Sequence, residues 1–253
     1  MKNYDPQLRS RLAATNDRLD EVVLNVRFRD WNDYLVEDTK RRVSRLELNP
    51  CGDRYQHSPD RELFALCQEH AAGYNQPLTA DNVLVLVHPF YLSLTHIVHL
   101  DESNQEEYKG YLDRLLNFLD AKPDRSKLGI VIFDSVHHYA SASSLLVESG
   151  AVDLALLTEY DSGYLINNSD LSYFEDKSFF FAGGYNDQCL SSAIENVLAI
   201  DFQKTEGFSE IWAVRDLVLN SPLRFSELIP QSVRGVRESR NIDLDGLIKK
   251  LNL

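Results

Sequence analysis

Short apolar runs alternate with amphipathic stretches through the middle of the chain. The runs at residues 83–87, 128–133, 152–157 and 179–181 are rich in β-branched, leucine or phenylalanine residues. Such runs are typical of strands buried on both faces of a parallel sheet. Between the first two runs, residues 106–120 are predicted to form an amphipathic helix with a single apolar face, made by Tyr108, Tyr111, Leu112, Leu115, Leu116 and Leu119.

The order of these elements predicts the fold class. Strand and helix alternate along the chain, which is typical of an α/β domain with a mainly parallel sheet. Right-handed crossovers between parallel strands leave few other arrangements. We therefore expect a Rossmann-like, three-layer core over residues 80–200, with a helix-compatible segment at 137–149 between its second and third strands.

Both flanks of this core are predicted to be helical. In the N-terminal extension, residues 1–79, the last helix would open at Pro59-Asp60 and end before Gly73 and Pro77. In the C-terminal segment, residues 201–253, helices are expected around 208–219 and at 243–251. We expect both extensions to pack on the core as one compact unit.

The acidic residues are concentrated in the predicted core. The chain of 253 residues has a formal net charge of −13, and residues 81–200 hold 18 acidic against 6 basic side chains, a net of −12. An acidic surface repels phosphate backbones, so nucleic acid is excluded as an expected partner. A small-molecule substrate or a protein partner is expected instead.

Targeting and cofactor motifs are missing from the sequence. No apolar run approaches the roughly 18 residues that cross a bilayer, and the N-terminus has no apolar stretch typical of a signal peptide. The odd number of widely spaced cysteines (Cys51, Cys67 and Cys189) predicts neither a disulfide framework nor a metal knuckle. A cytoplasmic protein without membrane contact is expected. No nucleotide cofactor is expected either, because the GxGxxG and Walker patterns are absent.

The ends of the predicted strands indicate where a site would lie. Ligands of open parallel sheets bind outside the carboxyl ends of the strands, where the strand order reverses. That rule selects the segments 88–91, 134–138, 158–161 and 183–189, each of which begins where an apolar run turns polar. The residues predicted to contact a substrate are Gly183, Gly184, Tyr185, Asn186, Tyr91 and Glu159.

The segment 178–200 is the most informative of these strand ends. It is interpreted as a buried strand, a glycine turn at Gly183-Gly184, a helix cap at Asn186 and an amphipathic helix. Cys189 would then lie in the first helical turn, where the helix dipole stabilises a thiolate. A cysteine beside an apolar stripe is also common as a small core residue, so both interpretations of Cys189 stay open.

A cysteine-dependent hydrolase is the first functional hypothesis. Cys189 would be the nucleophile, with a histidine from the other strand ends, His88 or His137, as its base. Asp134 would belong to the same catalytic group, and the amides after Gly184 would stabilise an oxyanion.

One family shows a similar turn. Gly183, Asn186 and Cys189 stand at the spacing of the GxxTxxC turn of the isochorismatase-like cysteine hydrolases, with asparagine in place of threonine. The resemblance implies that Cys189 is nucleophilic. It covers about twenty residues. The aspartate and lysine of that family's triad are not matched, because His88 follows the first strand and Glu159 the third.

Two other functions remain open. A metal-dependent hydrolase would draw its ligands from His88, Asp134, His137, His138 and Glu159, since two histidines and a carboxylate are a common ligand set. Adjacent histidines point in different directions, so at most one of the pair would join a given set. A non-catalytic α/β binding module is the other possibility, since a fold alone does not assign function.

Overall fold

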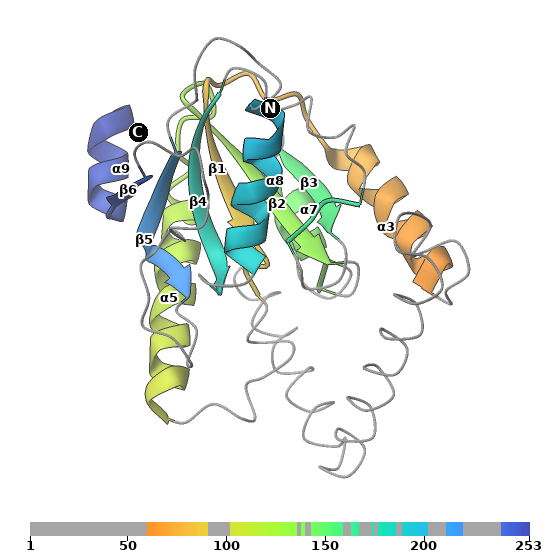
Figure 1. The fold of residues 1–253 in the computed structure, drawn as a ribbon, viewed down its shortest axis with the longest axis horizontal. Coiled ribbons are helices and arrows are strands. Elements are labelled where there is room, and N and C mark those ends of the chain that lie inside the picture. The colour runs from red at the N-terminus through yellow and green to blue at the C-terminus, as the bar shows by residue number, and fades with distance from the viewer. Residues whose placement is uncertain are drawn as a thin grey trace.

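The computed structural model describes residues 60–90, 102–135, 138–139, 143–158, 163–166, 174, 177–185, 189–201, 211–219 and 239–253. These residues form one parallel sheet with helices on both faces (Figure 1). The helices predicted before residue 59 lie outside the described residues.

The described sheet has six strands in the order β3-β2-β1-β4-β5-β6, and every neighbouring pair is parallel. The strands are β1 (Asn82–Val87), β2 (Leu128–Ser135), β3 (Leu154–Thr158), β4 (Ser178–Tyr185), β5 (Ile211–Leu219) and β6 (Ser239–Ile242). The first four lie where the apolar runs predict them. The α/β class with a mainly parallel sheet is therefore confirmed.

The strand order reverses at β1. The chain first moves outward from β1 through β2 to β3, and then returns to place β4 on the other side of β1. The last residue of β1, Val87, is in register with Phe133 of β2 and with Gly183 of β4. His88 therefore follows directly at the reversal point, where open α/β sheets form their ligand crevice.

Helices cover both faces of the sheet. The helices α3 (Asp60–Tyr74), α5 (Glu102–Asp120), α7 (Ser144–Glu148) and α9 (Leu244–Leu251) contribute to the core on one face, and α8 (Ser191–Asp201) contributes on the other. In Figure 1, α8 crosses in front of the sheet, with α5 behind it. The two layers of helices and the sheet between them make the three-layer core.

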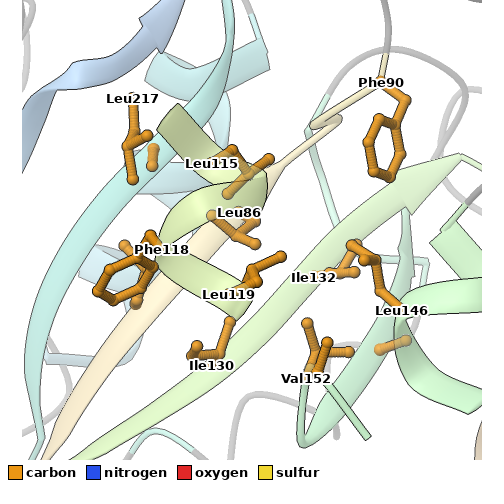
Figure 2. Close-up of a cluster of buried hydrophobic side chains, with 14 of the residues drawn as sticks. Leu86, Phe90, Leu115, Phe118, Leu119, Ile130, Ile132, Leu146, Val152 and Leu217 are labelled. Atoms are coloured by element: carbon orange, nitrogen blue, oxygen red, sulfur yellow. The ribbon is translucent and has the colours of Figure 1, made fainter. Parts of the chain in front are cut away.

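The two faces are filled by alternate residues of the strands. In β1, Leu84 and Leu86 belong to the core beneath α5, while the intervening valines belong to the core beneath α8. Leu115 and Leu119 of α5 lie over Leu86 and over Ile130 of β2 (Figure 2). Burying one such side chain stabilises the fold by about 1.5–3 kcal/mol, which explains why the apolar runs are continuous.

The C-terminal segment corrects one prediction. Residues 208–219 were expected to form a helix, but Ile211–Leu219 is strand β5, which pairs with β4 and with β6. The apolar residues Ile211, Val214 and Leu217 recur at helical spacing because β5 buries parts of both faces. The last helix is confirmed as α9, capped by Asp243, whose side chain accepts a hydrogen bond from Gly246 N at 2.7 Å.

The glycine pair corrects a second prediction. Gly183 and Gly184 were expected in a turn after the strand, but both lie within β4, which runs to Tyr185. Gly183 has a φ of 98°, and the β4–β5 register shifts on either side of it. A Cβ atom at this position would lie 2.1 Å from the carbonyl oxygen of Val87. The glycine therefore lets two strands approach closely at an irregular point of the sheet.

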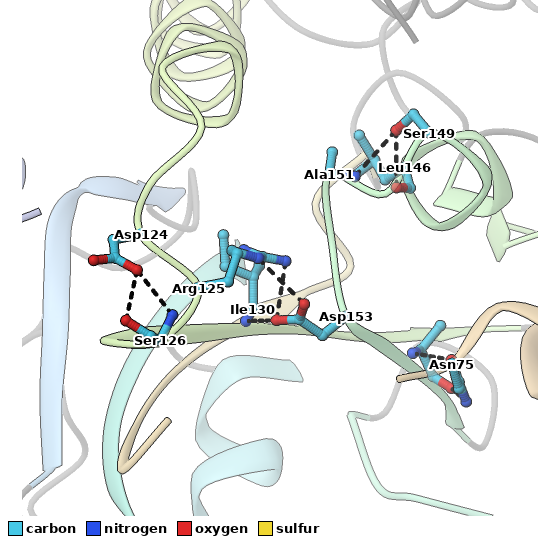
Figure 3. Close-up of polar contacts among 10 residues, drawn as sticks. Asn75, Asp124, Arg125, Ser126, Ile130, Leu146, Ser149, Ala151 and Asp153 are labelled. Carbon is cyan, nitrogen blue, oxygen red and sulfur yellow. Dashed lines mark hydrogen bonds and ion pairs between the residues drawn. The ribbon is translucent and has the colours of Figure 1, made fainter. Parts of the chain in front are cut away.

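A side chain covers the outer edge of β3. Asn75 follows α3, and its Oδ1 accepts a hydrogen bond from Ala155 N at 2.8 Å, while its Nδ2 donates to Ala155 O at 3.2 Å (Figure 3). The amide of Asn75 therefore satisfies backbone groups that would otherwise offer a neighbouring chain a pairing edge.

We expect Asn75→Ala to lower the free energy of unfolding by about 1–2 kcal/mol, because two part-buried backbone groups lose their partner. Exposure of the edge should also produce concentration-dependent self-association. Thermal unfolding and size-exclusion chromatography measure both effects. Gln76→Ala is the matched control, since among the described residues the Gln76 side chain donates to the neighbouring carbonyl groups of Tyr74 and Asn75. Equal stability of the two variants would contradict this role of Asn75.

Candidate functional site

A group of buried polar side chains lies at the carboxyl ends of β1, β2 and β3. Asp134, His88, Ser143 and Thr158 are 0% exposed, and His138 is 4% exposed. Burial of this many polar groups is unfavourable unless each is hydrogen-bonded or ion-paired. Their contacts define what the group can do.

His88 is held by its backbone and by its ring. It has a φ of 43°, a conformation that few residues other than glycine adopt. Its N–H donates to Phe133 O at 2.8 Å, and its Nε2 lies 2.9 Å from Thr158 Oγ1. Since β2 separates β1 from β3, the ring reaches across the end of β2 to the last residue of β3. The unusual backbone turn thus aims the imidazole along the carboxyl edge.

Asp134 organises the second half of the group. Its Oδ1 accepts a hydrogen bond from Ser135 N at 3.0 Å, and its Oδ2 accepts one from the Ser143 hydroxyl. The same Oδ1 lies 3.5 Å from Nδ1 of His138, four residues further along the chain. The carboxylate therefore has donors on both oxygens and an imidazole at ion-pair distance.

The two halves meet through their histidines. The ring centroids of His88 and His138 are 6.0 Å apart, with the rings edge to face. Asp134 faces Nδ1 of His138, which puts Nε2 on the side of the ring remote from the carboxylate. A carboxylate at ion-pair distance from one nitrogen of an imidazole can stabilise positive charge that develops on the ring during proton transfer. General acid–base chemistry is what this arrangement can perform.

Cys189 belongs to a second group, on the β4 side of β1. It precedes α8, is 2% exposed and lies in the core on the α8 face. A Cβ atom added to Gly184 would lie 3.5 Å from Cys189 Cβ and 3.2 Å from Val87 O. Gly163, with a φ of 77°, approaches the carbonyl group of Cys189 from another side. Cys189 is thus buried beside the backbone of Gly163 and Gly184. The strands β1 and β2 lie between β4 and β3, the strand that ends at Thr158, the hydrogen-bond partner of His88.

The predicted site residues divide accordingly. His88 and Asp134 lie at the ends of the neighbouring strands β1 and β2, and both have His138 as a neighbour. Gly183, Gly184 and Cys189 lie near one another and adjoin Val87, the residue before His88. The backbone of Tyr185 closes β4. The other predicted residues, Tyr91, His137, Glu159 and Asn186, lie outside the described residues.

Of the two adjacent histidines, which the sequence proposed as metal ligands, His138 is the one described, and it faces Asp134 at the i+4 spacing of a helical turn. The structure adds Ser143, which the pattern did not single out. Ser143 had no distinguishing signal, because a serine in a serine-rich stretch is ordinarily exposed. Within the described part of the chain, no three His, Cys, Asp or Glu side chains are grouped so that they could hold a metal ion.

No protein-family model, curated protein or solved structure matches this chain. The three-residue likeness to the isochorismatase-like hydrolases therefore gains no support from a longer match. Among the described residues, no helix combines the length and apolar character needed to cross a bilayer.

Proposed function

We propose that this protein is a small-molecule hydrolase whose site lies at the carboxyl ends of β1, β2 and β3. The observation that carries the proposal is the buried pair of Asp134 and His138, 3.5 Å apart, beside the ring of His88. A carboxylate–imidazole pair at the end of β2, beside His88 at the reversal point, supports general-base catalysis at the edge where such folds bind ligands. The strand order also supports a Rossmann-like description of the core.

In the proposed reaction, His138 Nε2 removes a proton from water as the water oxygen attacks the electrophilic carbon of the substrate. Asp134 stabilises the imidazolium that forms. The same proton then passes from His138 to the leaving group. The acyl product thus keeps the hydroxyl group of the water, and the leaving group takes its proton. His88, oriented by Thr158, would contact the substrate or the leaving group. Exclusion of bulk water strengthens each of these interactions.

The charge of the core indicates the class of substrate. Residues 81–200 carry a net charge of −12, which disfavours the approach of substrates that carry phosphate groups or free carboxylate groups. A neutral or cationic ester or amide is therefore the preferred substrate class. Hydrolysis of an anionic phosphoester faster than a neutral ester would contradict this part of the proposal.

Cys189 gives the proposal a second mechanism. Its place at the start of α8, beside Gly184, favours a thiolate nucleophile that forms a covalent intermediate. Its enclosure and the direction of the His88 ring favour water instead. The Cys189→Ala variant separates the two, because only the covalent mechanism requires the sulfur atom.

The test is a panel of neutral, cationic and anionic chromogenic esters and a small amide. We expect Asp134→Asn and His138→Gln to lower turnover roughly 100-fold or more, because the general base loses its orientation or its ring. Cys67→Ala is the matched control, since Cys67 is also buried but lies on the other face of the sheet. Thermal unfolding of each variant separates lost chemistry from lost fold.

Each outcome of the panel has a defined meaning. If Cys189→Ala loses as much turnover as His138→Gln, the cysteine is the nucleophile. If Cys189→Ala keeps the wild-type rate, water is the nucleophile. The proposal is overturned if turnover is unchanged in both Asp134→Asn and His138→Gln, or if no compound of the panel is hydrolysed. In either case the buried polar group has a structural role.

A further inference from the structure

A hydrogen-bonded group on the α3 side of the sheet lies next to the proposed site. Nδ1 of His70, in α3, lies 2.8 Å from the hydroxyl of Tyr139, and Nε2 of His70 lies 3.3 Å from Glu148 Oε1 in α7. The His70 and Tyr139 rings also meet edge to face, with centroids 5.8 Å apart. His70 thus joins two helices to Tyr139.

One tautomer of His70 gives both of its contacts a donor and an acceptor. Tyr139 is 1% exposed, and burial raises the pKa of its phenol well above the ordinary value, with nearby Cys67 and Glu148 adding to the shift. The phenol stays neutral, so it can donate to His70 Nδ1 when the imidazole carries its proton on Nε2. In that tautomer Nε2 donates to the Glu148 carboxylate, and each of the two contacts joins one donor to one acceptor.

Tyr139 follows His138 directly in the chain. Its ring is buried in the core on the α5 face, while His138 faces Asp134. A hydrogen bond that fixes the Tyr139 hydroxyl therefore also restrains the backbone that carries His138. The 2.8 Å bond to His70 comes from a different element, 69 residues earlier in the chain.

We propose that His70 is a positioning residue: through its hydrogen bond to Tyr139 it holds His138 in place against Asp134. The inference deepens the proposed function and rests on it for its catalytic consequence, but the restraint itself can be measured without any substrate. Glu148 supports the same arrangement by holding His70 in the tautomer that accepts from Tyr139.

Two substitutions of His70 separate its two contacts. His70→Asn places an amide oxygen near the position of Nδ1 and can still accept from Tyr139, but it is too short to reach Glu148. His70→Gln places an amide nitrogen near the position of Nε2 and can donate to Glu148, but it leaves Tyr139 without its acceptor. Tyr139→Phe keeps the aromatic ring and removes only the hydroxyl, so it should behave as His70→Gln does.

The first readout is hydrogen exchange of the backbone amides of His138 and Tyr139 in the full-length protein. We expect exchange to become about fivefold faster in His70→Gln and Tyr139→Phe, the effect of one lost hydrogen bond. His70→Asn should stay close to wild type. If all three variants exchange alike, or if only His70→Asn is affected, the positioning role is overturned.

The second readout uses the ester hydrolysed in the panel. We expect His70→Gln to lower kcat and leave KM unchanged, because neither His70 nor Tyr139 contacts the substrate in the proposed reaction. His70→Asn should keep the wild-type kcat. If the variants show the expected exchange pattern but the wild-type protein hydrolyses none of the esters, the proposed function is overturned and the restraint of His138 still stands. If turnover falls in Asp134→Asn but is unchanged in both His70→Gln and Tyr139→Phe, the positioning role is overturned and the proposed function still stands.

Discussion

Replacing Gly183 by alanine is expected to lower the free energy of unfolding by roughly 3–5 kcal/mol. The residue has a φ of 98°, which is unfavourable for any side chain. The new Cβ would also lie 2.1 Å from Val87 O and 2.7 Å from Val87 N, both backbone atoms of β1. Because β1 is paired on both sides and buried on both faces, it cannot move away without disturbing the sheet.

The neighbouring glycine provides the control for this prediction. A Cβ at Gly184 would lie 3.2 Å from Val87 O and 3.5 Å from Cys189 Cβ, contacts that a shift of a few tenths of an ångström relieves. Gly184→Ala should therefore cost about 1 kcal/mol or less. Urea denaturation of both variants measures the difference. Similar midpoints for the two variants would show that Gly183 is not the point of close approach between β1 and β4.

The consequence for the site is direct. The atoms that a Gly183 side chain would displace belong to Val87, the residue before His88. A Gly183→Ala protein that still folds should therefore lose the position of His88 relative to Thr158 as well as stability. Its turnover of the ester should fall more than that of Gly184→Ala, measured at a temperature where both variants are folded.

Asp153→Ala is expected to be the second most damaging substitution, with a loss of roughly 2–4 kcal/mol. Asp153 accepts hydrogen bonds from Arg125 Nε at 3.2 Å and from Ile130 N at 2.8 Å, and its Oδ2 lies 3.0 Å from Arg125 Nη2 (Figure 3). Burial lowers the pKa of the Arg125 guanidinium, and the charge of Asp153 opposes that change. Removing the carboxylate leaves a buried cation and a strand amide without their acceptor.

Chemical denaturation of a series at this position checks the explanation. Asp153→Asn keeps an acceptor but removes the charge, so its stability should lie between those of wild type and Asp153→Ala. Asp124→Ala is the control: its carboxylate is exposed, and its hydrogen bonds to Ser126 and its ion pair with Lys127 at 3.8 Å are local, so little change is expected. Because Asp153 precedes β3 at the amino end of the sheet, ester turnover at low temperature should be unchanged. An Asp153→Ala protein as stable as wild type would contradict the account.

The first four strands were predictable because each is apolar on both faces. A run such as Val83–Val87 has no polar position to expose, so only a doubly covered parallel strand fits it. The helix α5 was predictable for the opposite reason, since one apolar stripe demands one buried face. In both cases the local pattern and the tertiary environment agree.

The strand β5 was not predictable from its own residues. Its apolar side chains recur at a spacing that suits a helix as well as a strand, with Arg215 partly exposed between them. The alternative was decided by β4, which pairs in parallel with both ends of β5, at residues 211–213 and 218–219. Pairing with a distant segment overrides local preference because it satisfies every second backbone group of the strand at once.

For the candidate site, the sequence by itself indicated the edge of the sheet and three of its residues, His88, Asp134 and His138. It did so because apolar strands must end where polar side chains begin, and parallel strands end on the same side. Only the tertiary structure decided that Asp134 faces His138, that His88 turns toward Thr158, and that Cys189 is enclosed on the β4 side of β1. Those directions depend on strand order and on a positive φ at His88, and both arise from contacts between segments that are distant in the chain.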